Sequence, residues 1–189
     1  RGLGDVYKRH PKGCAFLHVR EDRRANVRPV IISHGANSKR TDRPRFRLEF
    51  DYVGSIDASP WIVAGECVRV MERIFPGGWP AIMKHNRELA LAARRLLCER
   101  FGSEPGAPDT MIGCMATIRI PDRSPSENGI PTRYHDPIQN RLIRDWGVQA
   151  PIVTFPAPPA RSVRVSAQIY NTLAQYEYLA EAIAGSVVY

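Results

Sequence analysis

The sequence lacks any run of about 18 apolar residues, the length that a membrane-spanning helix needs. Its opening stretch, RGLGDVYKRH, has no apolar core of the kind that secretory signal peptides carry. Cysteine is scarce, and Cys14, Cys67, Cys98 and Cys114 form no C-x-x-C pair. No two histidines have metal-ligand spacing, so no metal site is predicted. These absences predict a cytoplasmic protein without a membrane span, whose cysteines are buried free thiols.

The sequence also lacks a concentrated basic face, although its formal net charge is +8 and its pI is near 9.7. The densest basic runs, residues 20–28 and 38–47, are interrupted by acids, prolines or asparagine. Nucleic-acid binding usually needs a clustered basic surface with aromatic residues for stacking. Solvated loops are therefore favoured over a nucleic-acid partner. Nonspecific polyanion binding stays open as an alternative, and it would predict strong salt dependence.

Hydrophobic periodicity predicts a mixed order of helices and strands in this chain of 189 residues. We expect strands at 14–19, 28–35, 111–120, 150–155 and 162–169, with 111–120 central. We expect an irregular or extended segment from Phe46 to Pro60, where Asp57 or Ser59 caps the next helix. The helices are expected at 61–75, 79–101, 137–146 and 171–184. This order predicts an α+β fold with a small antiparallel sheet covered by helices on one face.

The stretch SVRVSAQIYNT, residues 162–172, alternates in residue type with a period of two. Such alternation is typical of a half-buried strand, so Val163, Val165, Ala167 and Ile169 share one face. The second face then carries the polar side chains, and Arg164 lies in the middle of it. From local pattern alone, an arginine there is an ordinary residue on a solvated strand face.

Five segments in order carry a resemblance to a known family: PKGCAFLHVR, RPVIISHG, FDYVGSIDASPW, HNRELALAARRLL and VRVSAQIYNT. From about Gly4 to Tyr178, the chain resembles the C-terminal half of class V aminotransferases, which are pyridoxal-phosphate (PLP) enzymes of fold type I. It most resembles their isopenicillin N epimerase-like branch, and cysteine desulfurases more distantly. The resemblance implies an α/β family fold in which residues 1–35 are the tail of the large PLP-binding domain. Residues 36–189 would form its small C-terminal α+β domain.

The resemblance assigns substrate and cofactor contacts to three residues. Arg164 matches the arginine that holds the substrate carboxylate, and a planar guanidinium suits a carboxylate because it offers two parallel donors. Gly54 and Ser55 match a Gly-Thr pair that reaches the cofactor phosphate of a partner subunit, which implies a homodimer. From local signals alone, Gly54 and Ser55 are equally well explained as a turn before a capped helix. Asn171 and Thr172 are expected to shape the turn into the last helix.

The resemblance also implies a lysine that forms a Schiff base with PLP and moves the substrate α-proton. Relatives carry this lysine in a His-Lys-Trp stretch shortly before the P-K-G segment. Here the region is GDVYKRHPKGCAFL, which lacks His-Lys-Trp, and Lys8 lies nearest to the expected place. Lys12 matches the lysine of P-K-G, which is not catalytic. An ordinary exposed lysine is the alternative for Lys8.

The function implied by the resemblance is a PLP-dependent enzyme acting on an amino-acid or peptide carboxylate. The reaction would be epimerisation, transamination or C-S cleavage, so the enzyme would be an isomerase, transferase or lyase. The family places the aspartate at the pyridine nitrogen and the aromatic stacked on the ring in its N-terminal half. Because this sequence has no counterpart of that half, a fragment is expected. The alternative is a catalytically silent dimerisation or binding module derived from such an enzyme.

Overall fold

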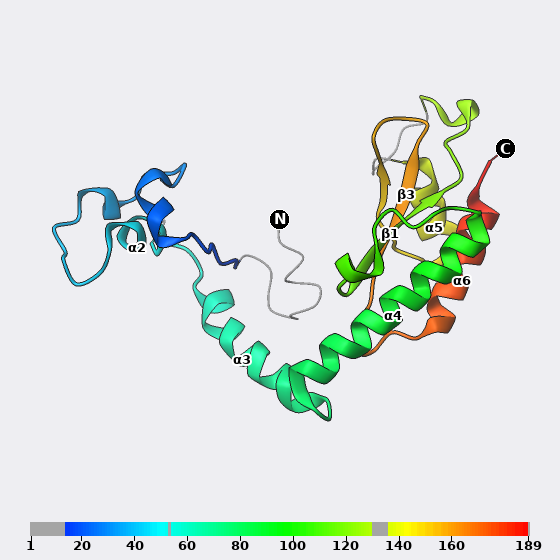
Figure 1. The fold of residues 1–189 in the computed structure, drawn as a ribbon. Coiled ribbons are helices and arrows are strands. Elements are labelled where there is room, and N and C mark those ends of the chain that lie inside the picture. The colour runs from blue at the N-terminus through cyan, green and yellow to red at the C-terminus, as the bar shows by residue number, and fades with distance from the viewer. Residues whose placement is uncertain (1–13, 53, 130–135, 189) are drawn as a thin grey trace. The chain divides into compact units, whose positions relative to one another are not determined.

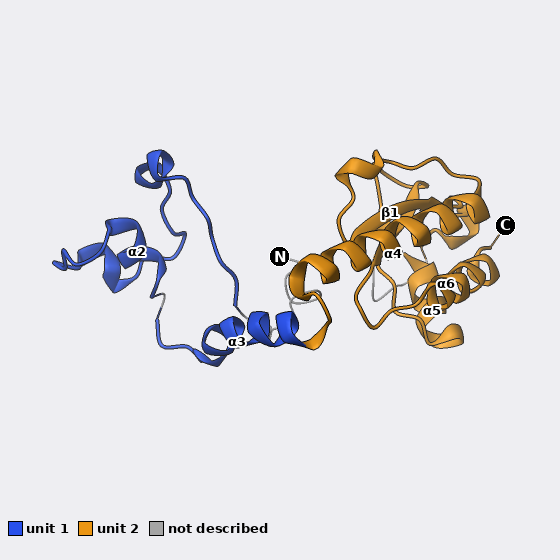
Figure 2. Cartoon of the chain, turned by 60° about the horizontal axis from the view of Figure 1, so that its bottom comes forward, with its two compact units in different colours: residues 1–73 blue, residues 74–189 orange. Residues whose placement is uncertain are grey.

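The computed structural model describes residues 14–52, 54–129 and 136–188 (Figure 1). The chain divides into two compact units, Arg1–Arg73 and Ile74–Tyr189 (Figure 2). Within the described residues, none of the helices has the length and apolar character needed to cross a membrane.

The first unit contains short helices and one longer helix. Two 3-10 helices, Glu21–Asn26 and His34–Asn37, are followed by α2 (Arg45–Phe50) and α3 (Ser59–Ile74). The strands expected at 14–19 and 28–35 are wrong, because neither segment pairs with another described segment. A strand is stabilised by the ladder to its neighbour, and apolar residues alone do not supply that ladder.

Residues 45–50 form a helix where an irregular or extended segment was expected, so that prediction is also wrong. One reason is local: Arg45 and Glu49, four residues apart, form an ion pair on one side of α2. The cap expected before the next helix is confirmed for Asp57, whose Oδ1 accepts a hydrogen bond from the Ser59 amide at 2.9 Å. Hydrogen bonds with the side chain and then the amide of Ser59 lower the pKa of the Asp57 carboxyl below its ordinary value.

The second unit begins with a long helix, α4 (Gly78–Phe101), which confirms the helix expected at 79–101. Gly102 ends it in the left-handed conformation, with φ of 61°, which glycine adopts without steric cost. Two further helices follow in the sequence, α5 (Pro137–Trp146) and α6 (Leu173–Ser186). The predicted bounds of α5 agree with the structure.

A three-stranded antiparallel sheet completes the second unit, with strand order β1-β3-β2. The strands are β1 (Met115–Ile120), β2 (Ile152–Thr154) and β3 (Arg161–Ser166). The small antiparallel sheet is thus confirmed, but β3 is its central strand. The expectation that 111–120 is central is wrong, because among the described strands β1 pairs with β3 alone and lies at an edge.

The hydrophobic core of the second unit lies between one face of the sheet and its helices. Helix α4 packs against β1, β3 and α6, and Figure 1 shows α4 and α6 running side by side. Burying each large aliphatic side chain contributes about 1.5–3 kcal/mol. Core side chains that are at most 1% exposed include Leu97, Ile118, Ile138, Leu142, Ile152, Val163 and Ile183. The described helices of this unit contribute their buried side chains to this core.

Candidate functional site

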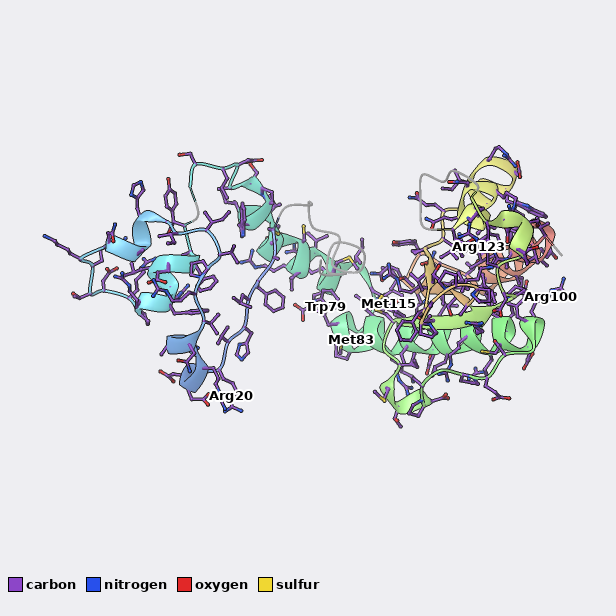
Figure 3. All side chains as sticks on the ribbon, turned by 90° about the horizontal axis from the view of Figure 1, so that it is seen from above. Arg20, Trp79, Met83, Arg100, Met115 and Arg123 are labelled. Carbon is purple, nitrogen blue, oxygen red and sulfur yellow. The ribbon has the colours of Figure 1, made fainter. Side chains whose placement is uncertain are left out.

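The face of the sheet that points away from the core carries mostly polar side chains. Because β1 pairs with β3 in antiparallel register, Thr117 lies opposite Arg164 and Arg119 lies opposite Ser162. Alternation along each strand puts all of these side chains on the same face. We call the following set the open face: Met115, Thr117, Arg119, Val153, Ser162, Arg164 and Ser166. Met115, labelled in Figure 3, marks the first residue of β1.

Arg164 occupies the centre of the open face, on the central strand. Its amide donates a hydrogen bond to the Pro151 carbonyl at 3.1 Å, which fixes the backbone at this position. The residue is half-buried, and its Nε atom is buried without a hydrogen-bond partner. Among the described residues, no carboxylate forms an ion pair with Arg164. The structure therefore places Arg164 on the face predicted for it, and its guanidinium has no ion-pair partner among the described residues.

Gly54 and Ser55 lie in the first unit, just before α3. The φ of Gly54 is +126°, a conformation that side chains disfavour, and a Cβ there would meet nothing within 4 Å. Ser55 is exposed. The pair thus offers an accessible backbone and a hydroxyl donor. Gly54 and Ser55 belong to the first unit, and Arg164 belongs to the second. Lys8 lies outside the described residues.

The turn after β3 is organised by side-chain amides, as expected for Asn171 and Thr172. Asn171 Oδ1 accepts from the Gln168 amide at 3.0 Å, and Gln175 Oε1 accepts from the Thr172 amide at 3.2 Å. Gln168 is 2% exposed and accepts a hydrogen bond from Asn86 Nδ2 of α4 at 3.0 Å. Asn171 and Thr172 therefore shape the entry into α6.

A second arginine of β3, Arg161, has a different environment that the sequence interpretation missed. Its guanidinium is 0% exposed, and Nη1 donates to Glu127 at 3.0 Å and to Asp136 at 3.1 Å. Arg141 also pairs with Glu127, and Asp136 caps α5 by accepting from the Ile138 amide at 3.0 Å. We call Arg161, Glu127, Asp136 and Arg141 the buried charge network.

The buried charge network fastens the region after β1 to the end of β3. Arg161 Nε donates to the Pro121 carbonyl at 2.7 Å, and Arg123, labelled in Figure 3, donates to the Glu127 carbonyl at 2.6 Å. Burial raises the pKa of Glu127, but hydrogen bonds from Arg141 and Ser124 and the charge of Arg161 outweigh it. The net pKa of Glu127 lies below its ordinary value, so the carboxylate is ionised at neutral pH.

The two basic runs are largely neutralised by neighbouring carboxylates. Glu49, 2% exposed, accepts from Arg28 at 2.6 Å and from Arg45 at 2.8 Å. Burial raises the pKa of Glu49, but these hydrogen bonds leave it below its ordinary value. Arginines of these runs that pair with acids are Arg20, Arg23, Arg28, Arg40, Arg43, Arg45 and Arg47. This pairing weakens the positive field that polyanion binding requires.

Cysteines and metal ligands form no centre in the part of the chain that the structure describes. None of the four cysteines forms a disulfide within the described residues. Cys98 is buried as expected, but Cys14, Cys67 and Cys114 are half-buried, so the expectation of buried thiols is wrong for these three. Burial raises the pKa of the Cys114 thiol, which disfavours the reactive thiolate. No group of three or more His, Cys, Asp or Glu residues among the described positions is arranged to hold a metal ion.

Comparison with known proteins relates the chain to two kinds of named enzyme. It is 28% identical over 196 residues to isopenicillin N epimerase of Streptomyces clavuligerus, covering 96% of this chain and 45% of that protein. The same enzyme of Amycolatopsis lactamdurans gives 28% identity with the same coverage. L-cysteine desulfhydrase of Arabidopsis thaliana is 23% identical over 190 residues, covering 92% of this chain and 39% of that protein. No protein-family model matches the chain. It spans less than half the length of these curated relatives.

Proposed function

We propose that the chain supplies the substrate-binding part of a PLP-dependent enzyme of the class V aminotransferase family, with Arg164 as the residue that binds the substrate carboxylate. One observation carries the proposal: Arg164 stands at the centre of the open face, and no carboxylate among the described residues forms an ion pair with its guanidinium. The similarity of nearly the whole chain to isopenicillin N epimerase supports it. A strand interior is a rigid mount, so the guanidinium orients the substrate as well as attracting it.

The cofactor contacts in this proposal come from the first unit. Gly54 leaves open space beside the backbone and Ser55 carries an exposed hydroxyl, so the pair fits one edge of a phosphate group. We assign it to the PLP phosphate of a partner subunit, which makes the enzyme a homodimer. When bound, PLP supplies the electron sink for chemistry at the substrate α-carbon. Lys8 is the proposed lysine that moves the α-proton.

The proposal includes a domain assignment and a second polypeptide segment. Residues 1–35 would belong to the large PLP-binding domain and residues 36–189 to the small domain. The groups that hold the pyridine ring would come from sequence that corresponds to the other part of the relatives' length. In this view the chain is one part of a longer cytoplasmic enzyme.

The substrate class follows from what the two kinds of relative have in common. One is named as an epimerase of isopenicillin N and the other as a desulfhydrase of L-cysteine. These are different reactions, so the shared part is recognition of an amino-acid-like molecule. A carboxylate is the group that a lone guanidinium recognises best, because a bidentate pair fixes both charge and orientation. We therefore assign an amino-acid-like carboxylate as the substrate class.

Binding of a simple carboxylate tests this proposal. Butyrate is titrated into the isotope-labelled chain at low salt and followed by NMR shifts of backbone and arginine side-chain signals. We expect shifts centred on β1 and β3 that saturate, and at least a tenfold loss of affinity in Arg164→Gln. Arg144→Gln is the matched control, because Arg144 is an exposed arginine of α5 paired with Asp145. In parallel, PLP followed by borohydride is expected to label Lys8.

Equal butyrate affinity in Arg164→Gln and in the wild type would contradict the assignment of Arg164 as the carboxylate-binding residue. The chain would then be better described as a catalytically silent dimerisation or binding module. The dispersion of the NMR spectrum of each variant shows that it is folded, so a loss of binding is not mistaken for a loss of structure.

A further inference from the structure

A second arginine lies on the open face next to Arg164. Arg119 of β1 pairs in register with Ser162, and Thr117 pairs with Arg164. Arg119 is therefore the diagonal neighbour of Arg164 on the same face of the sheet. Diagonal Cβ atoms in antiparallel strands are about 7–8 Å apart or somewhat less, within reach of two long side chains. The two arginine side chains thus lie over the same small area of the open face.

Arg119 is accessible and only weakly engaged. Its side chain is 39% exposed and pairs with Asp122, which is 53% exposed and three residues further along the chain. An exposed ion pair of this kind contributes about 1 kcal/mol or less, because water screens both charges. A ligand carboxylate can therefore replace Asp122 as the partner of Arg119 at little cost.

The two remaining corners of this area are hydroxyl residues. Thr117 lies opposite Arg164 and Ser162 lies opposite Arg119, so two cations and two hydroxyls alternate around a four-residue patch. Thr117 is exposed and Ser162 is half-buried. Every side chain of the patch can donate hydrogen bonds, and two of them carry positive charge. This composition suits a ligand with two separated anionic groups better than one with a single carboxylate.

We propose that Arg119 is a second anion-binding residue, so that the substrate carries two anionic groups, one held by Arg164 and the other by Arg119. This inference rests on the proposed function of Arg164. It narrows the substrate from any amino-acid-like carboxylate to one with a further acidic group, as in a dicarboxylic amino acid or a peptide with an acidic side chain. Arg119 acts in specificity, and the chemistry at the α-carbon does not require it.

Two ligands of similar length, which differ in their number of carboxylates, distinguish the roles of the two arginines. Butyrate carries one carboxylate and glutarate carries two, and each is titrated into the full chain at low salt by NMR. We expect glutarate to bind about twofold to threefold more tightly, because its second carboxylate displaces Asp122 from Arg119 and gains only part of the roughly 1 kcal/mol of one exposed ion pair. In Arg119→Gln this preference is expected to vanish while the affinity for butyrate stays within twofold. Arg144→Gln, the matched control, keeps both affinities.

A third variant is expected to raise the affinity for glutarate, whereas Arg119→Gln lowers it. Asp122→Asn removes the carboxylate that competes for Arg119, so glutarate is expected to bind more tightly by about twofold to threefold, with butyrate unchanged. A purely structural role for Arg119 would not produce this gain.

The outcomes distinguish the two proposals. If butyrate binding needs Arg164 but glutarate shows no preference, or keeps its preference in Arg119→Gln, the role of Arg119 is overturned and the role of Arg164 stands. If butyrate binding does not depend on Arg164, the proposed function fails and the inference about Arg119 falls with it.

Discussion

Arg161 and Arg164 lie three positions apart on one strand and have opposite environments. The period of two along β3 puts Arg164 on the open face and turns Arg161 toward the core, beside Val163 and Val165. A buried guanidinium costs several kcal/mol unless carboxylates and carbonyls pair with it. For Arg161, the Pro121 carbonyl pairs with Nε, and Glu127 and Asp136 pair with Nη1, while Nη2 is buried without a partner. Arg161 is thus committed to structure, and Arg164 is the residue proposed to bind a ligand.

The buried charge network makes a prediction about stability. Arg161→Met leaves the buried carboxylate of Asp136 without a cation and leaves Glu127 with Arg141 as its ion-pair partner, so we expect a loss of about 3–5 kcal/mol in the free energy of unfolding. Urea denaturation followed by circular dichroism measures this loss. Arg164→Met is the matched control, the same substitution on the same strand, and its expected cost is about 1 kcal/mol or less. Equal losses in the two variants would contradict the assigned role of the network.

Among the elements, helix α5 was predicted from local signals, whereas two of the five expected strands, which need a distant partner, do not form. Helix α5 shows the first case, because Asp136 and Pro137 begin it and Gly147, at φ of 65°, ends it. The segments 14–19 and 28–35 show the second case. Their apolar composition favours strands, but strand formation depends on pairing with residues remote in sequence. Composition alone contains no information about whether that partner is available.

In the candidate site too, local properties could be predicted from the sequence, whereas contacts with distant residues could not. Alternation in residues 162–169 predicted the face of Arg164, because side-chain direction in a strand is a local property. The same alternation, extended back by one residue, assigns Arg161 to the core face, and this signal was available in the sequence. Its partners were not predictable, since Glu127 and Asp136 lie in a proline-rich loop whose path depends on tertiary packing. The pairing of Arg119 with Arg164 likewise needed the strand register.

The contact between α5 and α6 depends on a glycine. Gly185 of α6 faces the ring of Trp146, and a Cβ added there would lie 2.6 Å from Cζ2 of that ring. Trp146 also stacks edge-on with Tyr178 at a centroid distance of 5.9 Å, and Tyr178 donates to the Trp146 carbonyl at 3.0 Å. The ring is therefore held on two sides and has little freedom to move away.

Gly185→Ala is expected to destabilise the second unit by up to about 2 kcal/mol. Alanine favours a helix over glycine by about 1 kcal/mol, but overpacking costs about 1–3 kcal/mol. Thermal and urea unfolding measure the balance. In a Trp146→Ala background the clash is gone, so the same substitution should stabilise by up to about 1 kcal/mol. A double-mutant cycle with no coupling between the two positions would show that the ring does not restrict residue 185.

At the scale of the whole molecule, burial is unequal between the two units. The hydrophobic core cluster consists of residues of the second unit, from Ala93 to Ile183. In the first unit, by contrast, Leu48 and Met71 are the buried hydrophobic residues among those described. Several of its large apolar side chains are highly exposed, including Phe16 at 79%, Val30 at 101%, Ile32 at 76% and Ile62 at 76%. Hydrophobic stabilisation scales with apolar area removed from water, so the second unit has most of it.

This inequality predicts how amide hydrogens exchange along the chain. Amides of α4, β1 and β3 should exchange only through global unfolding, and a stability of several kcal/mol slows them by a factor of about a thousand or more. Amides of 14–20 and 27–33 belong to no ladder and little helix, so we expect exchange within about tenfold of the unprotected rate. Mass spectrometry of peptic fragments measures both.

Repeating the exchange at two protein concentrations extends the test to association. If residues 14–33 exchange slowly at both concentrations, the first unit is more stable than its burial predicts, and the inequality is contradicted. Protection that appears only at the higher concentration would have another cause. It would mean that a second copy of the chain covers the apolar segments, because the fraction of dimer rises with protein concentration. Such a result would also support the homodimer in which Gly54 and Ser55 meet the cofactor of the partner subunit.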